Sequence, residues 1–379
     1  MRTFTFYATS FIDFNKQFTN ALAKINFNPT LAFAFVSPQL PITEILNEFK
    51  NHHIALFGET SSGEILFDKS NKSTLVNSGV FVLTDINPDF FKAKMFERKG
   101  KDSFSFGEDI GEFINNCYKN PSVIIGGSGL DLDGQQLVEG IKEKTDEKIV
   151  IFGGLAGDDG KFEKTYVYNE FASVDSGAVV VVFDNEKIEL SGVATSGWVG
   201  LGMSHIITKS EGNIVYEIGN KPALDTYLEY LNIGIDDMPA IGVEYPLLIK
   251  RDNNIDALRA VTGIDTKKRS LMFAGSVPQG SVVSFSISPG FEVIENTKTK
   301  IQQFAKQNHE TDLFLLFSCV ARQLSLGPMV DDEIMLVADK WKVPVAGFFT
   351  YGEIGTNVNS TCDFYNQTFT LVSIKDLTH

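Results

Sequence analysis

Two loops of the chain repeat one pattern, G-x-x-x-x-G-E-I, at residues 58–65 (GETSSGEI) and 347–354 (GFFTYGEI). Glycine permits tight turns and a close approach of the backbone to a ligand. Hydroxyl groups of the first loop could donate to a carboxylate, and the glutamates of both loops could accept from an ammonium group. The residues concerned are Thr60, Ser61, Ser62, Glu64 and Glu353. Such loops favour a site for a small molecule that carries both charges, such as an amino acid. The alternative is that each Gly-Glu pair only closes a turn.

A third glycine-rich loop, residues 153–160 (GGLAGDDG), carries Asp158 and Asp159. Two adjacent carboxylates are costly to bury without a cation. They could bind an ammonium group or, weakly, Mg²⁺ or Ca²⁺. A solvated turn is the alternative interpretation. Because no cluster of His, Cys and Asp has the spacing of a zinc site, we expect neither a metal nor a cofactor.

The segment around Cys319 contains the other candidate group. Arg322 follows three residues later and could lower the pKa of the thiol, or anchor the carboxylate of a ligand. The alternative is a small buried cysteine beside a structural arginine. Because the second GEI loop is aromatic and can wall a pocket, we expect the ligand site in the C-terminal half, lined by Arg322, Tyr351 and Glu353. Glu64 is then mainly structural.

These loops each end a strand–helix–strand unit. Apolar runs of strand length flank segments with helical spacing of apolar residues, and the Gly-rich loop follows about thirty residues after the first strand, the length of a βαβ unit. The three units are 30–57, 122–154 and 311–349. Loops that leave the carboxyl ends of parallel strands form crevices where α/β proteins bind ligands.

Strand-like segments separate the units. Residues 176–195 and 202–218 each read as two strands joined by a turn, and 280–288 alternates like a half-buried strand. A helix is expected over 219–231, with Asn220 as its N-cap. The fold class is therefore mixed α/β, with two related halves built from βαβ units and antiparallel additions. The boundary is expected at Ile218-Gly219.

The composition limits the classes of partner. The chain has 33 Lys and Arg against 48 Asp and Glu, a net charge of −15, with no basic run. We therefore expect no binding to nucleic acid or to anionic membranes. The apolar runs have strand length, too short to span a bilayer, and the N-terminus has no clear signal peptide. With three cysteines, an odd number, the sequence predicts reduced thiols and a cytoplasmic location.

Seven motifs in order resemble those of FIST proteins. They are FGETSSGEI, GGLAGDD, SGAVVVVF, GNKPALDTYLEYL, LFSCVARQ, VPVAGFFTYGEIG and NQTFTLVSI. The chain departs from the family at Ala321, where Cys-x-Gly-Arg is usual. The resemblance implies a FIST N-terminal domain over 28–218 and a FIST C-terminal domain over 219–360, with a final strand over 361–375. It also implies a bacterial sensory module for small ligands.

We therefore expect a cytoplasmic, non-enzymatic sensor that binds a small polar metabolite. It would pass occupancy to a separate protein such as a kinase, cyclase or chemoreceptor. Two alternatives stay open. One is an enzyme that uses Cys319 or the acidic loops, which should hold a residue of perturbed pKa in a closed pocket. The other is a ligand-free scaffold, which should show an exposed apolar patch and no pocket.

Overall fold

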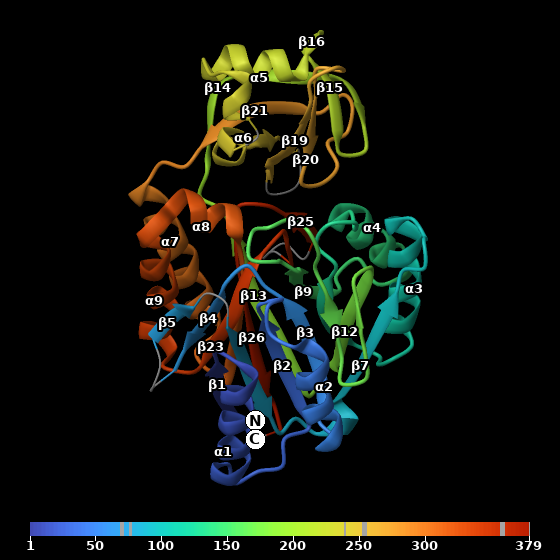
Figure 1. Cartoon of the computed structure of the whole chain (residues 1–379), viewed down its shortest axis with the longest axis vertical. Coiled ribbons are helices and arrows are strands. Elements are labelled where there is room, and N and C mark those ends of the chain that lie inside the picture. The colour runs from blue at the N-terminus through green and yellow to red at the C-terminus, as the bar shows by residue number, and fades with distance from the viewer. Residues whose placement is uncertain (69–71, 76–77, 239, 252–255, 357–360, 379) are drawn as a thin grey trace.

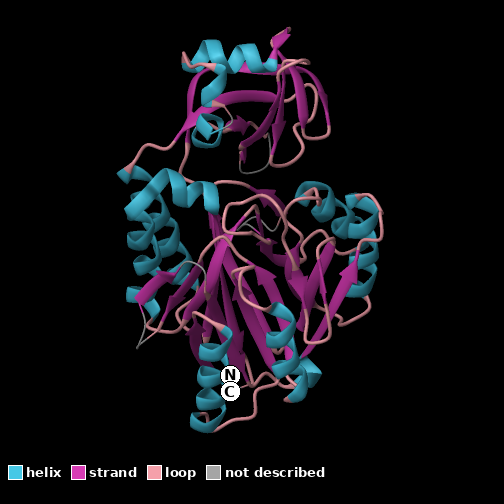
Figure 2. Ribbon diagram, viewed as in Figure 1, coloured by secondary structure: helices cyan, strands magenta, loops and turns pink. Residues whose placement is uncertain are grey.

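The computed structural model describes residues 1–68, 72–75, 78–238, 240–251, 256–356 and 361–378. Figure 1 shows a large body of sheets and helices with a smaller lobe above it. The secondary-structure colouring of Figure 2 shows strands in the centre of the body and helices at its sides. The predicted mixed α/β fold is confirmed. Within the described residues, no helix is long and apolar enough to cross a membrane.

All three predicted βαβ units are present, and in each the two strands pair in parallel. The three loops therefore follow the second strand of such a unit, as predicted. The first unit is β2 (Leu31–Val36), α2 (Ile42–Asn51) and β3 (Ala55–Thr60). The second is β8 (Pro121–Gly127), α4 (Gly134–Lys144) and β9 (Val150–Leu155). The third is β22 (Leu313–Cys319), α8 (Val320–Leu326), α9 (Val330–Trp341) and β23 (Val345–Thr350).

The two strands that follow each unit in the sequence form a hairpin, and this hairpin pairs with the second strand of a different unit. After β3, the hairpin β4 (Glu64–Phe67) and β5 (Lys72–Leu75) joins β23. After β23, β24 (Glu353–Thr356) and β25 (Cys362–Tyr365) join β9. After β9, β10 (Val167–Tyr168) and β11 (Ser173–Val174) join β3. The exchange is cyclic, so three six-stranded sheets with the same arrangement share one centre.

Antiparallel strands complete each sheet on the other side. They are β1 (Thr3–Ala8) and β6 (Gly79–Thr84), then β7 (Phe91–Glu97) and β12 (Gly177–Asp184), then β13 (Ile188–Thr195) and β26 (Phe369–Asp376). The two strands predicted within 176–195 are β12 and β13. They do not pair with each other, because β12 lies between β7 and β8 while β13 pairs with β26.

The inner faces of the three sheets pack on one another. The shared core takes Phe35 and Phe57 from the first unit, Phe152 from the second, and Phe317 and Phe348 from the third. The rings of Phe35 and Phe348 stack with centroids 4.8 Å apart. Helices cover the outer faces: α1 (Phe11–Lys24) with α2, α3 (Ser103–Asn115) with α4, and α7 (Phe291–Gln307) with α9.

The upper lobe is one insertion between β13 and α7. Its long strands are β14 (Val199–Glu211) and β15 (Ile214–Ile218), the hairpin predicted within 202–218, and β21 (Val282–Ile287), predicted within 280–288. Its other elements are β16 (Lys221–Pro222), α5 (Ala223–Leu231), α6 (Ala240–Glu244), β17 (Leu247–Ile249), β18 (Ala257–Arg259), β19 (Val261–Asp265) and β20 (Ser270–Phe273).

The helix predicted over 219–231 begins later than expected. Pro222 occupies the N-cap position of α5, and Asn220 lies in a left-handed turn before it, so the predicted Asn220 cap is wrong. The expected boundary at Ile218-Gly219 falls inside the lobe, because β15 and β16 on either side of it pair. The segment 361–375 supplies β25 to one sheet of the body and most of β26 to another.

Hydrogen bonds and an ion pair hold the lobe to the body. Arg259 of β18 is fully buried and donates to the carbonyl of Phe364 (3.3 Å) and to Oε1 of Gln135 (2.9 Å). Arg251 pairs with Asp363. Within the body, the two chain ends lie close together (Figure 1), and the Met1 amino group pairs with Asp312 and Asp376.

Candidate functional site

The three predicted loops meet at the centre of the body. Each donates a backbone N–H to the strand end of another unit: Ser62 to Phe349 (3.0 Å), Tyr351 to Leu155 (3.0 Å) and Gly157 to Thr60 (2.8 Å). These bonds close a ring. The ring brings together eight predicted site residues, Thr60, Ser61, Ser62, Glu64, Asp158, Asp159, Tyr351 and Glu353.

The two GEI glutamates have matching surroundings. Glu64 accepts from the hydroxyls of Ser61 and Ser78 (2.6 Å to Ser78). Glu353 accepts from the hydroxyl of Thr350 (2.5 Å) and from the hydroxyl and N–H of Thr368 (2.6 and 3.1 Å). Both side chains are buried, and burial raises the pKa of each carboxyl to about 7 against the opposing effect of these hydrogen bonds. Both glutamates therefore close the turn before an exchanged strand.

The two aspartates also bind the protein itself. Asp158 accepts from the N–H groups of Phe162, Glu163 and Lys164 (2.6–2.9 Å) and from the hydroxyl of Tyr351. One oxygen of Asp159 accepts from Ser37 (2.9 Å) and Gln39 (3.0 Å). Within the described residues, no group of three or more His, Cys, Asp and Glu is arranged to hold a metal ion.

Arg322 and Cys319 lie beside this ring and are buried. The Arg322 guanidinium forms a two-point ion pair with Glu333, and it donates to the carbonyls of Ser196 and Gln367 and to the Thr297 hydroxyl. Little capacity is left for a ligand. Cys319 ends β22 and is 3% exposed, and burial raises the pKa of its thiol well above its ordinary value. Its predicted buried place at a strand end is confirmed.

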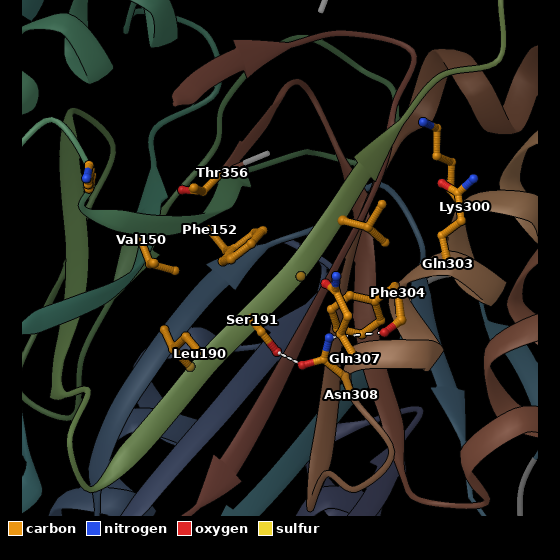
Figure 3. Close-up of a pocket in the computed structure, with 13 residues that line it drawn as sticks. Val150, Phe152, Leu190, Ser191, Lys300, Gln303, Phe304, Gln307, Asn308 and Thr356 are labelled. Carbon is orange, nitrogen blue, oxygen red and sulfur yellow. Dashed lines mark hydrogen bonds between the residues drawn. The ribbon is translucent and has the colours of Figure 1, made fainter. Parts of the chain in front are cut away.

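Two cavities lie elsewhere on the body, and none of the ten predicted residues lines either of them. One has a volume of about 910 Å³ and lies between β1, α1 and the segment from α9 to β23. The other, of about 430 Å³, lies between the start of β9, the middle of β13 and α7 (Figure 3). We call the latter the α7 cavity. Its lining comprises Lys148, Val150, Phe152, Leu190, Ser191, Gly192, Val193, Lys300, Gln303, Phe304, Gln307, Asn308 and Thr356.

The α7 cavity combines an apolar floor with polar walls. In Figure 3, β13 crosses the view between Phe152 and Thr356 on one side and the α7 side chains on the other. Helical spacing puts Lys300, Gln303, Phe304, Gln307 and Asn308 on one face of α7, because residues three and four apart are neighbours. Ser191 donates to the Asn308 amide oxygen (2.8 Å), which ties the floor to the helix.

Sequence reasoning missed this cavity, since it made no prediction for 291–307. The available signal was the stripe of polar residues around Phe304 on a helix that otherwise buries Val293, Thr297 and Ile301. The contribution of β9 and β13 could not be seen, because their contact with α7 depends on the exchange of strands between sheets.

Comparison with known proteins identifies the family. A model of the FIST N domain matches residues 30–221 and a model of the FIST C domain matches residues 223–356. The chain therefore belongs to the FIST family, whose domains are associated with sensing in signal transduction.

Similar proteins share only part of the chain. An uncharacterized protein of Methanocaldococcus jannaschii is 28% identical over 176 residues, which is 43% of this chain and 33% of that protein. An uncharacterized protein of Mycobacterium tuberculosis is 22% identical over 173 residues, which is 43% of this chain and 45% of that protein. The matches thus span between a third and a half of these relatives.

Proposed function

We propose that this chain is a cytoplasmic sensor that binds a small polar metabolite in the α7 cavity and relays occupancy to a separate signalling protein. The observation that carries the proposal is the cavity itself. Its volume of about 430 Å³ suits a small molecule, and it combines an apolar floor with a few polar groups, as ligand sites do. The three cysteines are free thiols, which fits the proposed location.

Helix α7 provides the physical route from cavity to lobe. It begins at Phe291, directly after the segment 288–290 that returns from the lobe. On the same helix, the Thr297 hydroxyl donates to Glu333 (2.6 Å) and accepts from Arg322 (3.1 Å). Arg322 in turn holds the Ser196 carbonyl, in the segment that enters the lobe. A ligand that shifts α7 would therefore act on both connections.

The two alternatives have less support. An enzyme that uses a Cys319 thiolate needs a lowered pKa, whereas burial raises the pKa of this thiol. Glu64, Asp158 and Glu353 use their carboxylate oxygens in hydrogen bonds within the body. A ligand-free scaffold is expected to have no pocket, whereas cavities of about 430 and 910 Å³ lie on the body.

A thermal-shift screen of amino acids, organic acids and sugars tests the proposal. A ligand that binds only the folded state raises the melting temperature by mass action. Gln303→Trp should fill the cavity and abolish the shift. The matched control is Gln302→Trp, at an exposed neighbouring position that does not line the cavity. Equal shifts in the wild type and both variants would reject the α7 cavity as the site.

A further inference from the structure

The charged groups that line the α7 cavity are of one sign. Lys148 and Lys300 are among its 13 lining residues, and none of the 13 is Asp or Glu. The chain as a whole carries 48 acidic residues against 33 basic ones. The charge of the cavity lining is therefore positive, whereas the net charge of the whole chain is negative.

The lysines and two of the amides are free to bind. In the part of the chain that the structure describes, neither Lys148 nor Lys300 forms an ion pair, and the side chains of Gln303 and Gln307 form no hydrogen bond. Lys298 lies two residues before Lys300 on the same helix and does not line the cavity; it is paired with Glu295 at 3.0 Å. The cavity thus offers ammonium and amide N–H donors at its rim.

The free acceptors of the cavity are neutral: they are the amide oxygens of Gln303 and Gln307 and the oxygen of the Ser191 hydroxyl, and none is a carboxylate. The Thr356 hydroxyl donates to the Ile151 carbonyl (3.0 Å) and accepts from the Ile151 N–H (2.8 Å). The Ser191 hydroxyl donates to the Asn308 amide oxygen. An ammonium group of a ligand would therefore meet two lysines and no carboxylate, which is a repulsive setting.

We infer that the ligand of the α7 cavity is a small carboxylate without an ammonium group, such as a 2-oxo acid or a dicarboxylic acid. This inference rests on the proposed function, since it names the class of metabolite sensed there. The carboxylate binds Lys148 or Lys300 through charge-assisted hydrogen bonds. The carbon chain lies on the apolar floor formed by Phe152, Leu190, Val193 and Phe304.

Pairs of compounds that differ only at C2, where one has an oxo group and the other an ammonium group, test the inference. The probes are 2-oxoglutarate against glutamate and 4-methyl-2-oxopentanoate against leucine, measured by calorimetry on the full chain. We expect at least one oxo acid to bind at least about tenfold more tightly than its amino acid, because the two lysines repel the ammonium group of the amino acid. Its affinity should fall as salt rises from low to high concentration.

Three lysine variants complete the test. At least one of the variants Lys148→Gln and Lys300→Gln should weaken oxo-acid binding by about tenfold, and Lys298→Gln should leave it unchanged. The inference is overturned if the amino acids bind as well as the oxo acids, or if the first two variants bind the oxo acid like the wild type. If the amino acids bind and Gln303→Trp abolishes that binding, the ligand class is wrong but the α7 cavity remains the binding site. Binding of none of the probes, with no hit in the wider thermal-shift screen, would overturn the proposed function too.

Discussion

At the scale of single residues, the repeated glutamate serves the fold. Glu64 and Glu353 were predicted to differ, with one structural and one in a ligand site. In the structure both are buried and both accept from a hydroxyl three residues earlier. The shared sequence pattern indicated only that both glutamates lie in the same kind of loop. It could not show that hydroxyls from Ser78 and Thr368, fourteen or fifteen residues further on, complete both sites.

The raised pKa of these glutamates predicts how stability depends on pH. Each is protonated in the folded state up to about pH 7, whereas the unfolded value is 4.5. At these two groups the folded state therefore holds more protons between these values, so their contribution to the free energy of unfolding falls as pH rises from 4.5 to 7. Each group contributes up to about 3 kcal/mol of this fall.

Glu64→Gln and Glu353→Gln should each remove one group's contribution to this pH dependence, since glutamine mimics the neutral acid. Urea unfolding at pH 5 and at pH 8 measures the free energy of unfolding at each pH, and the difference between the two values should shrink in each variant. Glu310→Gln, at an exposed position, is the control and should keep the wild-type difference. A reduced difference in only one of the two buried variants would show that the glutamates are not equivalent.

Arg322 should act as a structural ion pair. Arg322→Ala leaves Glu333 buried and unpaired, so we expect a loss of about 3–5 kcal/mol in the free energy of unfolding. The double variant with Glu333→Ala should lose less than the sum of the two single variants. Strict additivity in chemical unfolding would mean that the pair is not coupled.

At the scale of elements, the exchange of strands positions the loops. The sequence predicted the three βαβ units because each has its own apolar periodicity. It could not predict which sheet receives the next strand, because pairing partners such as β4 and β23 lie hundreds of residues apart. For the same reason β12 and β13 were predicted as strands but not placed in separate sheets.

Gly58 shows what the exchange requires locally. A Cβ atom at Gly58 would lie 1.8 Å from the ring of Tyr168, on the strand β10 that has crossed from another unit. Gly58→Ala should therefore push β10 away and lower the free energy of unfolding by about 1–3 kcal/mol. Gly234→Ala, where the nearest atom is a flexible carboxylate oxygen at 3.3 Å, is the control. Wild-type stability of Gly58→Ala in urea unfolding would contradict this packing.

At the scale of the whole molecule, the body uses both ends of the chain and the lobe interrupts it. The FIST N and FIST C matches meet near residue 222, inside the lobe. Replacement of residues 199–289 by a short Gly-Ser linker should leave a folded body, because the two connections lie close together: a Cβ at Gly197 would lie 3.2 Å from Val293 Cα. A cooperative thermal transition of the truncated chain is the expected result. A chain without one would show that the body depends on the lobe.

Hydrogen exchange measured with and without a saturating ligand from the thermal-shift screen tests the central claim most directly. If the α7 cavity is the sensing site, exchange should slow in 148–152, 190–193 and 300–308. It should also change in 288–291, where α7 meets the lobe. Protection confined to the loops at 58–65, 153–160 and 347–355 would contradict the account and place the ligand at the ring of loops instead.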